Sequence, residues 1–199
     1  GKPVYGVYST FVQRTYDQLQ QDLCINNNPI TILTFAASVW GMNDVTHLGI
    51  YDIPMMSNIP NLVYLAPTTY EEYIAMLDWS TEQRDHPVAI RVPGAVIHGE
   101  KPTKDYGILN KYETVQKGSG AAIIALGTFF SMGKQAAELI EKKTGVKPTL
   151  INPVYITGID EELLESLKKD HKAVVTLEDG ILDGGFGEKI ARFYGDSDM

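Results

Sequence analysis

The sequence is poor in cysteine, in clustered positive charge and in long apolar runs. Cys24 is its only cysteine, which excludes an intrachain disulfide and a zinc site built from cysteines. The net charge of −8 argues against a nucleic-acid-binding surface. No apolar run approaches the roughly 18 residues needed to cross a bilayer, and no signal peptide is recognisable. We therefore expect a cytoplasmic protein that binds small molecules and has neither nucleic-acid nor membrane partners.

Apolar runs alternate with helical patterns along the chain, which is typical of parallel α/β architecture. In the first half the sequence predicts strands at 4–8, 30–36, 62–66 and 88–92, helices at 11–25 and 69–81, and a short helix at 52–57. Ser9 or Thr10 is expected to cap the first helix, and Thr69 is expected to cap the helix at 69–81. Their hydroxyl oxygens can accept hydrogen bonds from the unpaired backbone N–H groups at a helix start.

The pattern changes after residue 93. Residues 94–120 show little periodicity and are expected to form a linker. A second alternating unit follows, with strands predicted at 121–126, 149–153 and 173–178 and helices at 131–143, 160–170 and 186–193. The sequence thus predicts an α/β fold of two consecutive three-layer domains with mainly parallel sheets, over 1–93 and 121–199. We expect both to be truncated, since the chain begins on a strand and ends just after a helix.

The stretch from Tyr8 to Gln18 is the most informative part of the sequence. It begins a helix directly after a strand, at the edge of a parallel sheet where ligands collect. Phe11 and Arg14 stand three residues apart and share one face of that helix. A flat aromatic ring beside a cation suits a planar heteroaromatic ligand, although ordinary packing explains many such pairs.

Five motifs occur in order along the chain. They are Tyr8-Ser9-Thr10-Phe11 with Gln13-Arg14 and Tyr16-Asp17-Gln18, Thr46-His47 with Gly49 and Asp52, Asn58-Ile59-Pro60-Asn61-Leu62 with Ala66-Pro67, Pro87-Val88-Ala89-Ile90-Arg91, and Gly184-Gly185-Phe186-Gly187. Together they resemble the motifs of the thiamine-diphosphate enzymes of the transketolase superfamily, and most of all those of the 1-deoxy-D-xylulose-5-phosphate synthases.

The resemblance implies part of a pyrimidine-binding domain followed by a truncated transketolase C-terminal domain, with thiamine diphosphate and Mg²⁺ as cofactors. In that family an acidic residue that protonates the aminopyrimidine precedes the Tyr-Ser-Thr-Phe segment. A separate N-terminal domain with a Gly-Asp-Gly…Asn motif holds the diphosphate and the metal. Neither is in this sequence, so we expect no metal ligand in this chain. We expect a fragment of a homodimeric enzyme, with the missing N-terminal diphosphate-binding domain as its partner.

The resemblance also implies roles for single residues. Phe11 would stack on the aminopyrimidine, and Arg14 would bind the pyrimidine or a neighbouring carboxylate; core packing and a surface ion pair are the respective alternatives. His47 would act in catalysis, because an imidazole exchanges protons near neutral pH. Tyr8 would donate a hydrogen bond to a substrate oxygen or, alternatively, be a buried tyrosine.

Substrate contacts are expected from Arg91 and Asn43. Arg91 ends a strand and has a planar fork that suits a phosphate or carboxylate, with an ion pair between the domain and the linker as the alternative. Asn43 stands where the resembling synthases have aspartate. Ala36-Ala37 and Val92-Pro93-Gly94 replace their Asp-Arg and Tyr-Pro-Arg. Two arginines that would bind an acceptor phosphate are thus absent, and tight binding of glyceraldehyde 3-phosphate is not expected.

By resemblance, the function is that of a transferase that decarboxylates pyruvate and transfers a two-carbon unit to an aldehyde such as glyceraldehyde 3-phosphate, with the isolated fragment inactive. Three alternatives remain open: a transketolase-like enzyme, a 2-oxoacid dehydrogenase β subunit, and a non-catalytic assembly module. The glycines at 184, 185 and 187 precede a helix but are expected to form a tight turn, because Glu178, Asp179 and Asp183 would repel a phosphate.

Overall fold

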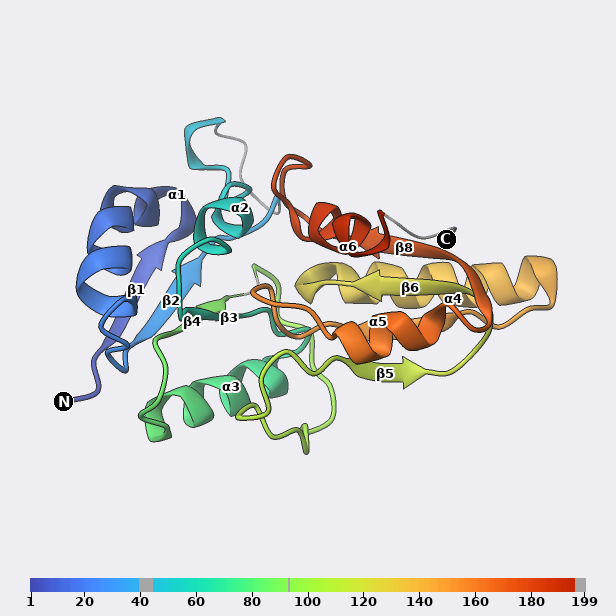
Figure 1. The fold of residues 1–199 in the computed structure, drawn as a ribbon, viewed down its shortest axis with the longest axis horizontal. Coiled ribbons are helices and arrows are strands. Elements are labelled where there is room, and N and C mark those ends of the chain that lie inside the picture. Colours follow the sequence, from blue (N-terminus) through green and yellow to red (C-terminus); the bar gives the residue numbers. More distant parts are fainter. Residues whose placement is uncertain (40–44, 93, 196–199) are drawn as a thin grey trace.

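A computed structural model describes residues 1–39, 45–92 and 94–195 of the chain (Figure 1). Two four-stranded sheets lie side by side in it, the first from the N-terminal half and the second from the C-terminal half. The first sheet has the order β1 (Val4–Tyr8), β2 (Thr31–Phe35), β4 (Val88–Arg91) and β3 (Val63–Leu65), and all of its paired strands are parallel. These are the four strands that the sequence predicts, shorter by one or two residues where they differ.

Helices cover both faces of the first sheet. One face carries α1 (Ser9–Val12), a 3₁₀ turn (Gln13–Thr15), a π-helical segment (Gln18–Cys24) and α2 (Asp52–Met56), and the other carries α3 (Tyr70–Glu82). A further 3₁₀ turn, Val45–His47, leads toward α2. The helix predicted at 11–25 is thus present, but it begins two residues earlier and changes its winding along its length.

The helix caps follow the prediction only in part. Thr69 caps α3 as expected, its hydroxyl oxygen accepting the N–H of Glu72 at 3.1 Å. The prediction for Ser9 and Thr10 is wrong, because both lie inside α1 and the residue before the helix is Tyr8, which makes no side-chain cap. The Ser9 hydroxyl is buried and has no hydrogen-bond partner among the residues that the structure describes.

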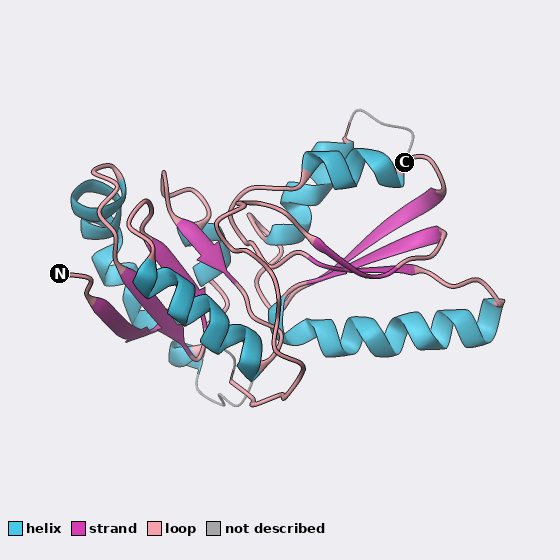
Figure 2. Cartoon of the chain, turned by 90° about the horizontal axis from the view of Figure 1, so that it is seen from below, coloured by secondary structure: helices cyan, strands magenta, loops and turns pink. Residues whose placement is uncertain are grey.

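The second sheet has one antiparallel edge. Its order is β5 (Glu113–Gln116), β7 (Thr149–Asn152), β6 (Gly120–Ala125) and β8 (His171–Leu177), with β5 antiparallel to β7 and the other pairs parallel. A 3₁₀ turn (Gly127–Phe129) leads into α4 (Phe130–Thr144), which covers one face; α5 (Glu161–Leu167) and α6 (Phe186–Tyr194) cover the other (Figure 2). The α/β class with two three-layer units and mainly parallel sheets is confirmed.

Strand β5 is the element that the sequence analysis missed. It lies within residues 94–120, the expected linker, and only alternate residues of it are partly buried. An edge strand of this kind lacks the continuous apolar run by which buried parallel strands are recognised. The rest of the segment packs against α3, where buried Tyr106 lies beside Trp79 with ring centroids 6.1 Å apart.

The carboxyl ends of the two sheets meet. The residues that follow β7 pair with β3: the N–H of Ala66 donates to the carbonyl of Val154 at 2.8 Å, and the N–H of Ile156 donates to that of Tyr64 at 2.7 Å. One hydrophobic core also runs through both halves, joining Ile32 of the first sheet to Ile124 of the second. Ligand sites of parallel sheets form at carboxyl ends, so this junction is where functional side chains are expected.

None of the helices within the described residues has the length and apolarity required to cross a lipid bilayer.

Candidate functional site

The predicted site residues come from two segments at the carboxyl edge of the first sheet. Tyr8 ends β1, and Phe11 lies in the helix that starts at the next residue. The segment after β2 returns to the same place and presents His47 at the end of its 3₁₀ turn. Strands β1 and β2 are parallel neighbours, so the residues that follow them emerge side by side.

Phe11 and His47 are in contact. Their ring centroids lie 5.3 Å apart with the planes at 90°, and the ring of Tyr8 lies 6.2 Å from that of Phe11 at 84°. Both contacts are edge-to-face, the geometry that the charge distribution of aromatic rings favours. Phe11 is 37% exposed and Tyr8 is 53% exposed. The two aromatic side chains therefore offer apolar surface that the protein itself does not bury, and the alternative of a buried tyrosine is wrong.

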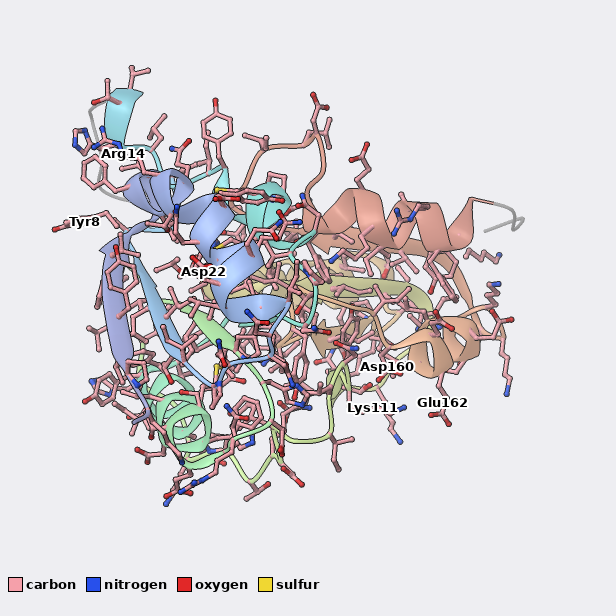
Figure 3. The ribbon with its side chains drawn as sticks, turned by 60° about the vertical axis from the view of Figure 1, so that its left-hand side comes forward. Tyr8, Arg14, Asp22, Lys111, Asp160 and Glu162 are labelled. Atoms are coloured by element: carbon pink, nitrogen blue, oxygen red, sulfur yellow. The ribbon has the colours of Figure 1, made fainter. Side chains whose placement is uncertain are left out.

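Arg14 completes the group. The central carbon of its guanidinium lies 5.6 Å from the centroid of the Phe11 ring, within the range of a cation–π contact. Figure 3 shows Tyr8 and Arg14 at the outer edge of the first half, away from the ion pairs of Lys111 with Asp160 and Glu162 in the second half. An open depression of about 550 Å³ lies here, lined by Thr10, Phe11, Gln13, Arg14, Thr46 and His47.

Hydrogen bonds hold His47 against the first helix. The hydroxyl of Thr10 donates to the carbonyl oxygen of Thr46 at 3.0 Å, which joins two segments 36 residues apart. The hydroxyl of Thr46 lies 2.7 Å from Nδ1 of His47, and the tautomer of the ring decides which of the two donates. The sequence analysis assigned no site role to Thr10, Gln13 or Thr46. Their position inside the two motifs that contain Phe11 and His47 was the available signal.

Arg91 lies elsewhere and is buried. It is 4% exposed; its Nε donates to Oδ2 of Asp52 at 2.7 Å, its Nη1 donates to Asp179, and its Nη2 donates to the carbonyl oxygen of Gly49 at 3.2 Å. All three nitrogens of the guanidinium thus have partners within the protein. This geometry does not support the expected contact with a substrate anion. The alternative of an ion pair fits better, although the partner lies beyond β8 and not in the linker.

The charges within this buried cluster set the protonation states of Arg91 and Tyr64. Burial alone would lower the pKa of Arg91, but the charges of Asp52 and Asp179 outweigh it and raise that pKa well above its ordinary value. Burial and the charge of Asp52 likewise raise the pKa of Tyr64, whose hydroxyl donates to Asp52. On the other side, Thr128 donates to Oδ2 of Asp179 at 2.9 Å. The cluster therefore keeps a cationic arginine and a neutral tyrosine.

Other candidate positions do not join the site. Asn43 lies outside the described residues. The glycine-rich segment before α6 forms a turn, with Gly184 at φ +71°, and the first N–H groups of the helix are taken by Glu178: those of Phe186 and Gly187 donate to its carboxylate at 2.8 Å each. A protein carboxylate thus occupies the place that an anion would need, as the tight-turn interpretation expects.

Volume alone does not single out the depression around Phe11 and His47. A second one of about 540 Å³ lies between α2 and α6, but two of its three charged side chains bond within the protein: Glu188 accepts the N–H of Gly184 at 2.6 Å, and Lys189 donates to the carbonyl of Ile156 at 2.5 Å. Within the described residues, no group of three or more His, Cys, Asp or Glu side chains is arranged to hold a metal ion.

Comparisons with known proteins match both halves of the chain. A family model described as "Transketolase, pyrimidine binding domain" matches residues 1–96, and one described as "Transketolase, C-terminal domain" matches residues 110–198. The two matches together take in both sheets and the whole depression around Phe11 and His47.

Curated relatives match over nearly the whole chain. A 1-deoxy-D-xylulose-5-phosphate synthase from Clostridium perfringens (strain SM101 / Type A) is 40% identical over 196 residues, which are 96% of this chain and 31% of the synthase. The synthase of that name from Clostridium beijerinckii is 37% identical over 199 residues, 99% of this chain and 32% of the relative. The synthase of that name from Shouchella clausii is 36% identical over 200 residues, which are 100% of this chain and 32% of the relative. The chain thus spans about a third of the length of these relatives.

A solved structure described as "Split gene transketolase, inactive beta4 tetramer" has the same fold. It matches with a TM-score of 0.85 and 21% sequence identity, over 98% of this chain and 63% of that chain. At this identity the likeness concerns the fold alone.

Proposed function

Because the chain belongs to the transketolase superfamily, as a pyrimidine-binding domain followed by a transketolase C-terminal domain, we propose that it works as part of a thiamine-diphosphate-dependent transferase. The synthases that it resembles carry the name of one such activity, 1-deoxy-D-xylulose-5-phosphate synthesis. In the proposed reaction pyruvate loses carbon dioxide and its remaining two-carbon unit joins an aldehyde.

One observation carries this proposal. Phe11, Arg14 and His47 come from two separate segments and converge on a single depression at the carboxyl edge of a parallel sheet. Had Phe11 and His47 been on opposite faces of the sheet, the motifs would have had no common site.

The residues present fit an aminopyrimidine. The exposed ring of Phe11 offers an aromatic surface for a planar ring, and the Arg14 guanidinium beside it offers donors to ring nitrogens or to a carboxylate. When bound, thiamine diphosphate supplies the nucleophilic carbon and the electron sink for making and breaking carbon–carbon bonds. No carboxylate is among the residues that line the depression. We accordingly assign the diphosphate and Mg²⁺ to another domain of the complete protein.

His47 and Tyr8 are proposed to serve the substrate. The imidazole of His47 can donate or accept a proton at a substrate oxygen, and its contact with the Thr46 hydroxyl orients the ring. The Tyr8 hydroxyl, on an exposed side chain at the end of β1, can donate a hydrogen bond to the same substrate. Both act by holding or moving a proton next to the pyrimidine-binding surface.

A second candidate concerns the acceptor. The guanidinium of Arg91 already donates to Asp52 and Asp179. Ala36-Ala37 stand where the resembling synthases have Asp-Arg. Among the lining residues of the depression, Arg14 is the only arginine or lysine. A charge-assisted contact contributes about 1.5–3 kcal/mol, so an acceptor phosphate would be bound weakly here. We therefore propose that the enzyme uses an unphosphorylated aldehyde as acceptor about as efficiently as it uses glyceraldehyde 3-phosphate.

The test uses the full-length protein that contains this chain. Release of carbon dioxide from pyruvate and formation of the ketose product are measured with glyceraldehyde 3-phosphate and with glyceraldehyde. We expect Phe11→Ala and His47→Asn each to lower kcat/KM at least 100-fold, while Phe193→Ala, which truncates a partly buried ring in α6, leaves it within about threefold. Saturation at micromolar glyceraldehyde 3-phosphate would defeat the acceptor proposal, and full activity of both site variants would defeat the assignment of the site.

Cofactor binding gives a separate check. Titration calorimetry of residues 1–199 alone with thiamine diphosphate and Mg²⁺ is expected to show little or no binding and no turnover, because the proposed diphosphate site lies elsewhere. Tight binding by this chain would contradict that placement. We also propose that the complete enzyme is a cytoplasmic homodimer, on its composition and its family; sedimentation of the full-length protein tests the dimer.

A further inference from the structure

We propose that Arg91 and Asp179 are positioning residues for His47, so that the C-terminal half of the chain sets the placement of the histidine in the first half. The catalytic meaning of this inference rests on the proposed function, but the structural coupling does not.

The segment after His47 is held at two successive carbonyls. Nη2 of Arg91 donates to the carbonyl oxygen of Gly49 at 3.2 Å, and the N–H of Ile181 donates to that of Ile50 at 3.1 Å. These contacts come two and three residues after the histidine. The second donor, Ile181, belongs to the C-terminal half and follows Asp179 by two residues. The same stretch of that half thus touches the His47 segment directly and through Arg91.

Gly49 leaves this segment little freedom. A methyl group on Gly49 would lie 2.0 Å from the carbonyl oxygen of Ala36, so the backbone at the end of the loop packs directly on the backbone at its start. Ala36 itself has φ +50°, a left-handed conformation that is unfavourable for a non-glycine residue. Gly49 therefore cannot move toward Ala36, and any other shift of its backbone is passed on to the neighbouring residues, two positions from His47.

The cation that reaches Gly49 is itself fixed from both halves. Asp52 of the first half and Asp179 of the second hold Arg91, and Thr128 donates to the far oxygen of Asp179. Asp52 is 1% and Asp179 2% exposed, so water does not weaken these pairs. A buried ion pair needs good geometry to offset its desolvation, and for that reason it has few alternative arrangements.

The junction contains a second polar contact that serves as an internal control. Nδ2 of Asn152 in the second half donates to Oε1 of Glu72 in the first at 3.2 Å, and Glu72 is also buried. The Glu72 carboxylate otherwise accepts hydrogen bonds from the N–H and the hydroxyl of Thr68, at 2.7 and 2.9 Å. Disturbing Glu72 should weaken the junction without moving the histidine.

The experiment compares Asp179→Asn with Glu72→Gln, each in the full-length protein. Both changes remove a buried charge at nearly constant size. The ring proton resonances of His47, displaced by the neighbouring Phe11 ring, report the position of the imidazole, and hydrogen exchange of the Ile181 amide reports its bond to Ile50. We expect Asp179→Asn to shift the His47 signals and speed exchange at Ile181 at least tenfold, with Glu72→Gln changing neither at a comparable melting temperature.

Kinetics supply a third readout. Displacing the proton-transfer group should lower kcat of Asp179→Asn about 10-fold or more, a larger change than in KM for pyruvate, because Asp179 itself does not line the depression. A general loss of folded protein would instead lower the activity of both variants in step with their stability. Arg91→Lys, which keeps the charge and loses the fork, should behave like Asp179→Asn. If Asp179→Asn does not fold, Thr128→Val removes one donor to Asp179 and should give a smaller effect in the same direction.

Unchanged His47 resonances and unchanged Ile181 exchange in the folded variants would overturn the inference. So would equal effects of Asp179→Asn and Glu72→Gln. Absence of transferase activity in the unmodified protein would reject the proposed function alone, because the resonance and exchange measurements still decide whether Asp179 positions His47.

Discussion

Two clusters at the carboxyl edge of the first sheet differ in how they use their charges. Phe11, Arg14 and His47 form an exposed group around an open depression, whereas Arg91 is surrounded by its own carboxylates in the junction between the halves. Only a few residues of chain separate them, since His47 belongs to one and Asp52 to the other. The difference teaches that a charged side chain at the right edge is available to a ligand only if the fold has not already neutralised it.

The largest expected effect follows from removing the cation of the buried cluster. Arg91→Ala leaves Asp52 and Asp179 as uncompensated buried charges, and breaking one partner of a buried pair costs about 3–5 kcal/mol. The free energy of unfolding in urea measures it. Arg84→Ala, at an exposed arginine, is the matched control and should stay within about 0.5 kcal/mol. A loss below about 1 kcal/mol for Arg91→Ala would mean that the ion pairs contribute little.

The link between the two clusters is tested at Gly49. Gly49→Ala places a methyl group against the backbone of Ala36, and overpacking of this kind costs about 1–3 kcal/mol. Urea unfolding gives the loss, and the His47 ring resonances should shift with it. At Gly195 an added methyl group would lie no closer than 3.4 Å to the nearest atom, so Gly195→Ala is the control and should change neither. If the His47 signals do not shift in Gly49→Ala, the two clusters are not structurally coupled through Gly49.

A partly buried cation with weaker pairing sharpens the comparison with Arg91. Burial, with a smaller effect from the charge of Arg192, lowers the pKa of Lys189 to about 8. An unfolded lysine titrates near 10.4, so between these values the unfolded chain binds the extra proton and stability rises with pH. The penalty is therefore present below pH 8 and disappears as the pH rises toward 10.4.

The measurement is the difference between the protein and its Lys189→Met variant. From pH 7.5 to 10 the free energy of unfolding of the unmodified protein should gain about 1–2 kcal/mol relative to the variant, a value reduced for the partial exposure of Lys189. Lys172→Met, at an exposed lysine, should show no such gain. A relative loss on raising the pH would show that Lys189 is stabilised as the cation.

The smallest expected effect on stability belongs to the exposed cluster. Phe11→Ala should lower the free energy of unfolding by about 1 kcal/mol and by less than about 2 kcal/mol, because over a third of that side chain is already exposed. Phe186→Ala, at a fully buried ring, should cost about 3–5 kcal/mol. The same urea titrations compare them. If Phe11→Ala lowered the free energy of unfolding as much as Phe186→Ala does, Phe11 would be a packing residue. The main support for a pyrimidine-binding surface would then be lost.

The sequence predicted the elements and the exposed cluster well because both depend on local patterns. Apolar runs predicted seven of the eight strands found in the described residues, and β5 was missed because an edge strand buries only alternate side chains. Phe11 and Arg14 are near neighbours in one helical segment, and His47 follows a parallel neighbour of the strand before it. The resemblance to the synthase motifs assigned them to one site, and the rule that parallel strands end at one edge explains why the structure brings them together.

Burial of single charges could not be predicted in the same way. Arg91 ends β4 and Arg14 lies in the helical segment that follows β1, and either could bind an anion from its residue type and position. What separates them is Asp179, which stands 88 residues after Arg91 and meets it only because the two sheets join at their carboxyl ends. Pairing over such a separation has no local signal.

The sequence by itself determined the α/β class, the order of the elements and the aromatic–histidine group, since apolar periodicity and short motifs act over a few residues. Only the tertiary structure decided that Arg91 is internal, that residues 113–116 extend the second sheet, and that the C-terminal half touches the segment of His47. The physical reason is that desolvation depends on everything packed around a group, and most of that comes from distant parts of the chain.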